Sequence, residues 1–452
     1  MIDVGPRVDW ENGLISNEIF VDEEIFKQEL EQVFRRCWLF VGHESSIPNN
    51  GDYLTNYMGI DQVIVLRDLK GKLRVFLNKC LHRGNRVCFF DRGNARTFTC
   101  TFHGWQYNMD GKLIGVPYFE DAYLGELDRE NWGLVGVPRV ATYGGLIFAC
   151  WDSGVMPLDD YLGDIRWYFD RLLTREYLGG IEVVGGVQRY VMPSNWKLLC
   201  DNFAGDDYHV PTTHASYFKV LMEDSRSHRI PFDMDRTITV SLGHTNGVPH
   251  GIGAMGIGDG EEQRQLDLNL AERYGTEIVD WVTERWARTT ERMKDDPVKV
   301  WKITNANVFP HFCILANASA FQGQALILWE PRKPLLTECW QWCAVDKDAP
   351  KLIKQLQVSN LMKGQAAAGL IATDDSENFE RSTDNLLGHE SVLQPFNYTM
   401  AVGHDHDHSF RGRLLSQGID VSLLPGLVGP HVWEAQQRQF YRYWSQLVAA
   451  ED

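Results

Sequence analysis

Two short cysteine and histidine pairs constrain this chain more than any other feature. Cys80 and His82 form a C-x-H pair, and Cys100 and His103 form a C-x-x-H pair after a spacer of residues 83–99. Each pair lies at the end of a short β-branched and aromatic run, such as KLRVFLNKC, so we expect both pairs in loops. The sequence therefore predicts a β domain whose loops present four metal ligands.

Two kinds of metal centre fit these four ligands. Two thiolates and two imidazoles can hold a tetrahedral zinc ion, which is the simpler interpretation. A structural zinc, however, usually stabilises a domain too small to fold alone, and this β region is long enough for its own core. The two cysteines can instead bind one iron of a [2Fe-2S] cluster and the two histidines the other, as in a Rieske centre. We favour the cluster and expect Cys88, which lies outside the spacing, to be a buried core residue.

Length and charge limit the architecture and the partners. A chain of 452 residues exceeds the size of one hydrophobic core, so two domains are expected. The 44 basic and 61 acidic residues give a net charge of −17, which argues against nucleic acid or an anionic membrane as partner. The chain does not start with a basic segment followed by an apolar run, and no long apolar span follows, which predicts a cytoplasmic protein whose cysteines are thiols or metal ligands.

The hydrophobic pattern changes twice along the chain. Apolar residues at helical spacing in residues 21–38 predict an amphipathic helix, and we assign residues 1–38 to an N-terminal helical segment. Residues 39–155 have the short runs of an antiparallel β domain, which would be the Rieske domain. Residues 156–452 mix the two patterns, with strands expected over 306–345, and therefore predict an α+β domain.

A second candidate metal site lies in the stretch DDYHVPTTH. His209 and His214 are five residues apart, which on an unbroken helix would separate them by about 500° of rotation. Pro211 breaks or kinks the helix between them, so both imidazoles can converge on one point. Two histidines and one carboxylate on one face of a ferrous ion leave the other positions free for dioxygen and substrate. The stretch therefore predicts two ligands of a non-haem iron site.

The third ligand of this site has several candidates. Asp206 precedes His209 by three residues, on the same helical face, where a hydrogen bond to the imidazole is the natural geometry. Asp207 is expected to be a solvated helix charge. We therefore expect neither nearby acid to complete the site.

Both stretches resemble the large (α) subunit of bacterial Rieske non-haem iron aromatic-ring-hydroxylating dioxygenases. The resemblance covers nearly the whole chain, and it includes C-x-H-R-G, C-x-x-H-G-W and the sequence NWKLLCDNFAGDDYHVPTTHASY. It implies that the cluster ligands are Cys80, His82, Cys100 and His103, with Trp105 packed beside them. It also implies a catalytic domain with an antiparallel sheet flanked by helices, and residues 1–38 are expected to pack on that domain.

The resemblance also implies roles for residues around the second metal. The third iron ligand would be Asp375 in GLIATDDSENFE, with Asp374 as the alternative ligand or a solvated charge. Asp206 would connect an iron-ligand histidine to a cluster histidine of the adjacent subunit and carry electrons between them. The pocket would be lined by Asn202, Phe203, Val210 and Gln365. Gln365 lies where hydrocarbon-oxidising relatives often carry an aromatic side chain, which leaves room for a substrate with a polar group.

The activity implied is that of a terminal oxygenase. Electrons from NAD(P)H would arrive through a reductase and usually a ferredoxin, and both atoms of O2 would enter an aromatic ring to give a cis-dihydrodiol. The cofactors would be one [2Fe-2S] cluster and one mononuclear Fe(II), in a homotrimer of α with or without β subunits (α3β3). A Rieske-type aromatic monooxygenase or demethylase would use the same centres, and a zinc-stabilised binding protein is a third possibility.

Two further surface features have alternative interpretations. Arg83, Arg86 and Arg92 are either solvated charges or a patch that steers an acidic ferredoxin. The segment GIGAMG at 251–256 matches G-x-G-x-x-G, but no strand is expected before it and no helix directly after it. We expect this segment to be a flexible loop near the pocket entrance.

Overall fold

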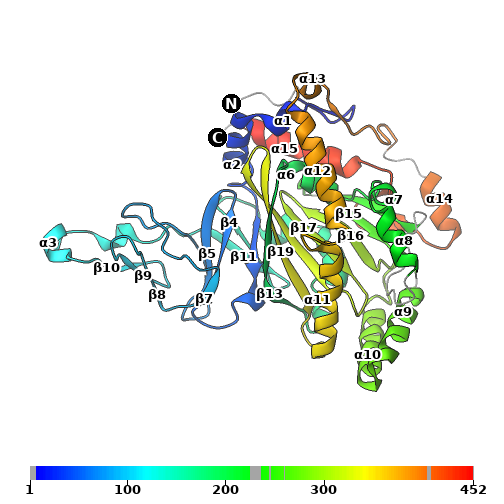
Figure 1. Cartoon of the computed structure of the whole chain (residues 1–452), viewed down its shortest axis with the longest axis horizontal. Helices are drawn as coiled ribbons and strands as arrows, with labels where there is room; N and C mark the ends of the chain where they lie inside the picture. Colours follow the sequence, from blue (N-terminus) through cyan, green and yellow to red (C-terminus); the bar gives the residue numbers. More distant parts are fainter. Residues whose placement is uncertain (1–6, 224–235, 244–245, 259, 405–408, 451–452) are drawn as a thin grey trace. The chain divides into compact units, whose positions relative to one another are not determined.

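The computed structural model describes residues 7–223, 236–243, 246–258, 260–404 and 409–450 (Figure 1). The described chain forms two compact units, and the division falls after residues 33 and 158. Residues 34–158 form one unit, and the other combines residues up to 33 with those from 159 onward. Within these described ranges, no helix is long and apolar enough to cross a membrane.

The unit of residues 34–158 is built from three small antiparallel sheets. Their strand orders are β6-β5-β4-β7, β10-β9-β8 and β11-β12-β3. The strands are β3 (Leu39–His43), β4 (Asp52–Met58), β5 (Asp61–Arg67), β6 (Leu73–Leu77), β7 (Arg92–Asn94), β8 (Thr97–Thr99), β9 (Gln106–Asn108), β10 (Leu113–Gly115), β11 (Arg139–Tyr143) and β12 (Leu146–Cys150), and a short helix α3 spans Phe119–Tyr123. One core cluster contains Cys80, Cys100, Trp105 and Tyr107. Cys88 is buried in the same cluster, which confirms its predicted packing role.

The larger unit is organised around one antiparallel sheet of eight strands. The order is β13-β19-β18-β17-β16-β15-β14-β21, and every pairing is antiparallel. The strands are β13 (Ile181–Met192), β14 (Ile238–Leu242), β15 (His250–Met255), β16 (Lys302–Val308), β17 (Phe312–Asn317), β18 (Gln324–Lys333), β19 (Leu336–Asp346) and β21 (Leu427–Pro430). A second, three-stranded sheet contains β1 (Val8–Asp9), β2 (Leu14–Ile15) and β20 (Phe396–Asn397).

Helices flank the large sheet. Helix α11 contacts β18 and β19, α6 contacts β18, and the C-terminal α15 contacts β14 and β15. Figure 1 shows α11 and α12 crossing in front of the sheet. The helices are α1 (Glu18–Val21), α2 (Glu23–Gln32), α4 (Leu158–Leu162), α5 (Ile165–Leu172), α6 (Trp196–Asn202), α7 (Val210–Thr213), α8 (Ala215–Glu223), α9 (Glu261–Ala271), α10 (Thr276–Arg292), α11 (Lys351–Gln365), α12 (Ala372–Leu386), α13 (His389–Val392), α14 (Ser409–Ser416) and α15 (Ala435–Ala449). The predicted α+β fold class is therefore confirmed.

The helix predicted over residues 21–38 is shorter than expected. The side chain of Asp22 accepts hydrogen bonds from the backbone N–H groups of Glu24 and Ile25, so it caps a new helix at this point. Helix α2 ends at Gln32, and two later apolar residues of the pattern, Phe34 and Trp38, are buried in the other unit. The apolar spacing continued across a unit boundary, which periodicity alone does not reveal.

The prediction of a flexible loop over 251–256 was wrong. Residues 250–255 form β15, a fully buried inner strand of the large sheet. Its glycines serve close packing, because a Cβ on Gly251 would collide with the backbone of Ala204 and one on Gly253 with the carboxylate of Asp207. The glycines thus let the loop before His209 lie directly on the sheet.

Candidate metal centres

The first ligand group lies on two similar loops. The backbone N–H of Cys80 donates to the carbonyl of Asn85, and that of Cys100 donates to the carbonyl of Trp105. Each loop also contains a glycine with positive φ, Gly84 at 79° and Gly104 at 75°. A left-handed backbone is readily adopted only by glycine, which explains why a glycine lies two residues after His82 and directly after His103.

The four predicted cluster ligands lie together, with the thiols buried and the imidazoles toward solvent. Cys80 and Cys100 are buried, whereas His82 is half-buried and His103 is exposed. The two imidazole rings are 4.5 Å apart between centroids. Burial raises the pKa of the Cys80 thiol, and a neighbouring hydroxyl, Tyr107 Oη, lies 3.3 Å from its sulfur. A bound metal would remove the proton that burial otherwise retains.

The four side chains come from two separate loops as two cysteines and two histidines. Such a set can bind one tetrahedral zinc ion, or a [2Fe-2S] cluster in which the cysteine pair binds one iron and the histidine pair the other. The ring of Trp105 stacks on His82 with 5.0 Å between centroids and 11° between planes, which fixes that imidazole.

The second ligand pair is placed by a helix of one turn. Helix α7 spans Val210–Thr213, with His209 as its N-terminal flanking residue and His214 as its C-terminal one. Pro211 lies in the first turn, where a backbone N–H has no intrahelical partner, so it fits the helix instead of breaking it. The two imidazoles still converge on one point, as predicted, because they flank the two ends of this short helix.

Asp375 meets both imidazoles from a distant helix. Its Oδ1 lies 3.4 Å from Nε2 of His209 and 3.2 Å from Nε2 of His214. These three side chains are the group whose ligating atoms lie within 4.8 Å of one another. Asp375 is in the first turn of α12, which begins after a break between α11 and α12. Imidazole nitrogen and carboxylate oxygen in this number suit iron, so the residues fit the predicted mononuclear ion.

The electrostatics of this group favour a bound cation. Burial opposes protonation of His209, but hydrogen bonds with Asp206 and Asp375 outweigh it and raise the pKa of His209 to about 10. Burial likewise opposes ionisation of Asp375, yet the two histidines hold the pKa of its carboxyl below the ordinary value. The carboxylates therefore draw positive charge to the point where the imidazoles meet, as a metal site requires.

The two neighbouring acids contact the outer nitrogens of the imidazoles. Oδ2 of Asp206 lies 3.4 Å from Nδ1 of His209, and the amide of Asn202 is also 3.4 Å from that nitrogen. Oδ2 of Asp374 lies 3.5 Å from Nδ1 of His214. Asp374 is therefore not a solvated helix charge, because it faces Nδ1 of His214, whose Nε2 faces Asp375. Such outer contacts orient a ligand ring and set its basicity.

The expectation that Asp207 is solvated was wrong. Its side chain is fully buried and accepts a hydrogen bond of 2.9 Å from Oγ1 of Thr304 and a weaker one from the amide of Asn305. Burial raises the pKa of Asp207 to about 7. The carboxylate packs against Gly253, and it thereby ties the loop of the histidines to the large sheet.

A cavity of about 120 Å³ opens onto this candidate iron site. Asn202, Phe203, Val210 and Gln365 line it, together with His209, His214 and Asp375. The wall also contains polar residues that no short sequence motif marks, namely Lys302, Thr304, Asn305, Asn317 and Gln322. Three of these residues interrupt the apolar strand β16, and polar side chains inside an otherwise buried strand are the signal that could have identified them.

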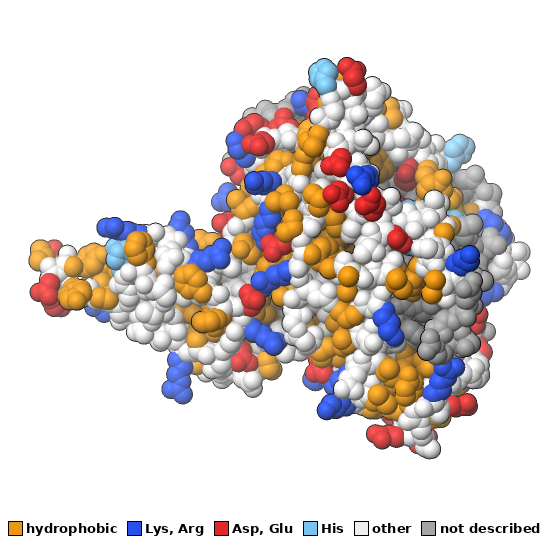
Figure 2. Space-filling view, in the orientation of Figure 1, with side chains coloured by type: hydrophobic (Ala, Val, Ile, Leu, Met, Phe, Trp, Pro, Cys, Tyr) orange, Lys and Arg blue, Asp and Glu red, His pale blue; other side chains and the backbone are white. Residues whose placement is uncertain are grey.

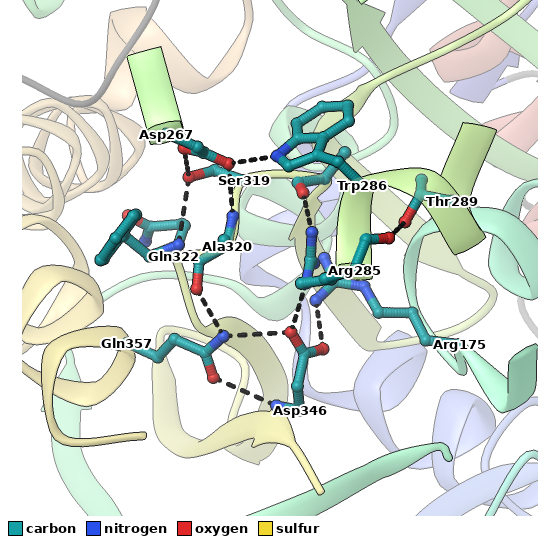
Figure 3. Close-up of polar contacts among 12 residues, drawn as sticks. Arg175, Asp267, Arg285, Trp286, Thr289, Ser319, Ala320, Gln322, Asp346 and Gln357 are labelled. Carbon is teal, nitrogen blue, oxygen red and sulfur yellow. Dashed lines mark hydrogen bonds and ion pairs between the residues drawn. The ribbon is translucent and has the colours of Figure 1, made fainter. Parts of the chain in front are cut away.

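A buried network fixes the wall of the cavity formed by residues 317–323 (Figure 3). Arg175 donates to the carbonyl of Asn317, and Arg285 donates to that of Ala318 over 2.6 Å. The carboxylate of Asp267 accepts from Ser319 and from the backbone of Ala320, each over 2.7 Å. Asp346 joins the two arginines, at 2.7 Å and 2.8 Å. The backbone of this wall is therefore held by ion pairs and hydrogen bonds.

Replacing Asp346 by asparagine is expected to lower the free energy of unfolding by about 3–5 kcal/mol, because it leaves two buried guanidinium groups without a counter-ion. Burial raises the pKa of Asp346, but Arg175 and Arg285 outweigh it and hold the pKa well below the ordinary value. The ionised Asp346 carboxylate therefore contributes fully to the free energy of unfolding above about pH 4. This contribution is lost as the pH falls through the lowered pKa of Asp346. Urea unfolding followed by tryptophan fluorescence tests both points. The exposed Asp348→Asn variant is the control and should unfold like the native protein.

Two family models match this chain, one over each unit. The description "Rieske [2Fe-2S] domain" applies to residues 37–139, and "Ring hydroxylating alpha subunit (catalytic domain)" to residues 158–450. The chain belongs to the ring-hydroxylating dioxygenase α-subunit family. This dioxygenase chain therefore contains a Rieske [2Fe-2S] domain, and as a terminal oxygenase it depends on an electron donor and acts on an aromatic substrate.

Relatives of this dioxygenase chain match it along its whole length. The biphenyl 2,3-dioxygenase α subunit of Rhodococcus jostii is 34% identical over 100% of this chain and 92% of the relative. The benzene 1,2-dioxygenase α subunit of Pseudomonas putida is 35% identical over 98% and 93%. Among solved structures, naphthalene 1,2-dioxygenase from Rhodococcus sp. bound to indole has a TM-score of 0.77 and 31% identity, and it covers 100% of this chain and 96% of that one.

Proposed function

We propose that this α subunit binds one mononuclear Fe(II) through His209, His214 and Asp375 and oxidises aromatic rings in the adjoining cavity. The observation that supports this most is the convergence of two Nε2 atoms and one carboxylate oxygen on the wall of that cavity. When bound there, Fe(II) supplies the activation of dioxygen that organic side chains lack. The product would be a cis-dihydrodiol, with both oxygen atoms of O2 added to one ring. Residues 39–155 would form the Rieske domain and residues 156–452 the catalytic domain.

The side chains around the iron ligands have positioning roles in this proposal. Asp206 and Asn202 hold the outer nitrogen of His209, so that Nε2 points into the cavity. Asp374 does the same for His214. Phe203 and Val210 contribute apolar surface against which a ring can pack. The arrangement holds a ring beside the ligands and limits the access of water to the reacting atoms.

We propose that electrons arrive from NAD(P)H through a reductase, with or without a ferredoxin, and cross between subunits at Asp206. The cluster histidine His103 is exposed, and exposed apolar side chains lie near it, including Phe102 at 58% and Tyr118 at 79% exposure. Figure 2 shows hydrophobic side chains gathered over the region of α3 and β10. Such a patch is typical of a surface that another chain covers. It supports a homotrimer of α, with or without β subunits (α3β3), in which Asp206 of one chain meets His103 of the next.

Iron content and product analysis test the proposed function. The purified protein should be red-brown and hold about three irons per chain, two in the cluster and one mononuclear. With a chemical or enzymatic electron donor and a panel of aromatic compounds, it should form cis-dihydrodiols that carry two atoms of labelled O2. A product with one labelled atom would instead indicate an aromatic monooxygenase or demethylase. A colourless zinc protein would exclude both activities.

A further inference from the structure

A second, smaller cavity of about 20 Å³ lies on the other side of Asp375, between α12 and the large sheet. On the sheet side, Ile327 of β18 and Gln341 of β19 are direct cross-strand partners, so their side chains leave the sheet on the same face, and both line this small cavity. On the other side, helix α12 crosses in front of the sheet (Figure 1). The helix residues that line the small cavity follow helical spacing, and they are Ala372, Asp375, Ser376 and Phe379.

Asp375 and Gln365 border both the small cavity and the larger one that opens onto the candidate iron site. The contacts of Asp375 with the two imidazoles, at 3.4 Å and 3.2 Å, are both made by Oδ1. The second carboxylate oxygen, Oδ2, is therefore available as an acceptor. The side chain of Gln365 makes no hydrogen bond or ion pair with any residue that the structure describes. The boundary of the small cavity thus offers one acceptor and one amide.

Gln341 brings a buried donor to the same cavity. Its side chain is 2% exposed, and its Nε2 makes no hydrogen bond within the part of the chain that the structure describes. The indole Nε1 of Trp329, another buried residue that lines the small cavity, also has no partner among the described residues. Buried amide and indole N–H groups are as a rule hydrogen-bonded to protein or to ordered water. The two side chains therefore indicate a bound acceptor.

A water molecule fits both the size and the chemistry of the small cavity. A cavity needs roughly 10–15 Å³ to hold one water, so about 20 Å³ suffices for one water but not for an organic molecule. Water accepts a hydrogen bond from an amide N–H and donates one to a carboxylate at the same time. Dioxygen has a similar size, but it would leave the amide of Gln341 without a hydrogen bond.

We infer that one water molecule binds in the small cavity, where it accepts a hydrogen bond from Nε2 of Gln341 and donates one to Oδ2 of Asp375. Gln341 is then a positioning residue. Through the water it restrains the carboxylate, so that Oδ1 keeps facing the two imidazoles. Hydrogen bonds to a ligating carboxylate fix its orientation and raise the affinity of a site for its metal. This inference rests on the proposed function, because Asp375 is a proposed iron ligand.

Fe(II) binding tests the role of Gln341 without turnover. Fe(II) is titrated anaerobically into the α subunit that retains its cluster but lacks the mononuclear iron, and binding is followed by calorimetry. Gln341→Met keeps the length of the side chain but removes its donor, and it should raise the Kd for Fe(II) by roughly 10- to 100-fold. Gln341→Asn keeps an amide donor and should restore most of the affinity.

A crystal structure of the native protein tests the water directly. It should show one water molecule within about 3.2 Å of both Nε2 of Gln341 and Oδ2 of Asp375. This measurement decides the question by itself if Gln341→Met is too unstable to titrate.

The control variant is Gln188→Met. Gln188 is the direct cross-strand partner of Gln341 on β13, but its amide contacts Met362 and it lies outside the lining of the small cavity. This variant should bind Fe(II) like the native protein. If Gln341→Met also binds Fe(II) as tightly as the native protein, or if no water lies between Gln341 and Asp375, the inference is overturned while the proposed function stands. If the native protein itself binds no Fe(II) beyond its cluster, the proposed function fails, and the inference fails with it.

Discussion

Replacement of Asp375 by alanine is expected to remove the mononuclear iron and to abolish ring oxidation, while the Rieske cluster remains. The two histidines alone leave the ion with too few protein ligands, because Asp375 is the acid whose oxygen lies within 3.4 Å of both Nε2 atoms. Iron per chain should fall from about three to about two. The visible spectrum of the cluster should be unchanged, because Cys80, His82, Cys100 and His103 lie in the other compact unit. Metal analysis and the visible spectrum of the same sample measure both quantities.

The adjacent acid provides the matched control for this experiment. Asp374→Asn removes one charge from the same turn of α12, but Asp374 contacts Nδ1 of His214 and not the point where the three ligands meet. We expect this variant to keep the third iron and to lose at most about 10–100-fold in activity, as is usual for contacts that orient a ligand. If Asp374→Asn loses the iron and Asp375→Ala keeps it, the two acids have exchanged roles.

The Asp206→Asn variant should keep all three irons and lose turnover. Asp206 faces the outer nitrogen of His209 at 3.4 Å, so its replacement leaves the three proposed iron ligands in place. In the proposed trimer the carboxylate of Asp206 carries electrons from a neighbouring cluster. The neutral amide of asparagine has no charge and does not take up a proton from the imidazole, as a carboxylate can. When the reduced enzyme is mixed with O2 and substrate, the cluster of the native protein should reoxidise rapidly. In Asp206→Asn the reoxidation should be slower by roughly a hundredfold or more.

Asp207→Asn separates this effect from a general loss of negative charge. The side chain of Asp207 accepts a hydrogen bond from Thr304 and packs against Gly253 of the large sheet, so it orients neither imidazole in the proposed mechanism. Its replacement should leave the rate of cluster reoxidation close to that of the native protein. Loss of the mononuclear iron in Asp206→Asn would show that Asp206 is a ligand, and normal turnover in that variant would show that electrons take another route.

Local sequence spacing was sufficient to predict the geometry of those ligands that lie close together in the chain. The two cysteine and histidine pairs each belong to one tight loop, closed by a hydrogen bond to its own cysteine and turned by Gly84 or Gly104. His209 and His214 flank a single helical turn that contains Pro211. Such geometry is set by a few consecutive residues, so spacing and residue type predict it. The α+β class followed in the same way from the periodicity of apolar residues.

The sequence resemblance named Asp375 and Asp206, but only the tertiary structure decided how each of the four acids lies at the proposed iron site. Asp206, Asp207, Asp374 and Asp375 have similar local sequences, yet one is buried against Gly253, two contact outer imidazole nitrogens and one meets both inner nitrogens. Their positions depend on how α12 and the loop before α7 pack on the large sheet, which involves residues far apart in the chain. Burial and long-range contact have no signature in a short window of sequence, and so the polar wall of the cavity also emerged only when β16, β17 and α11 came together.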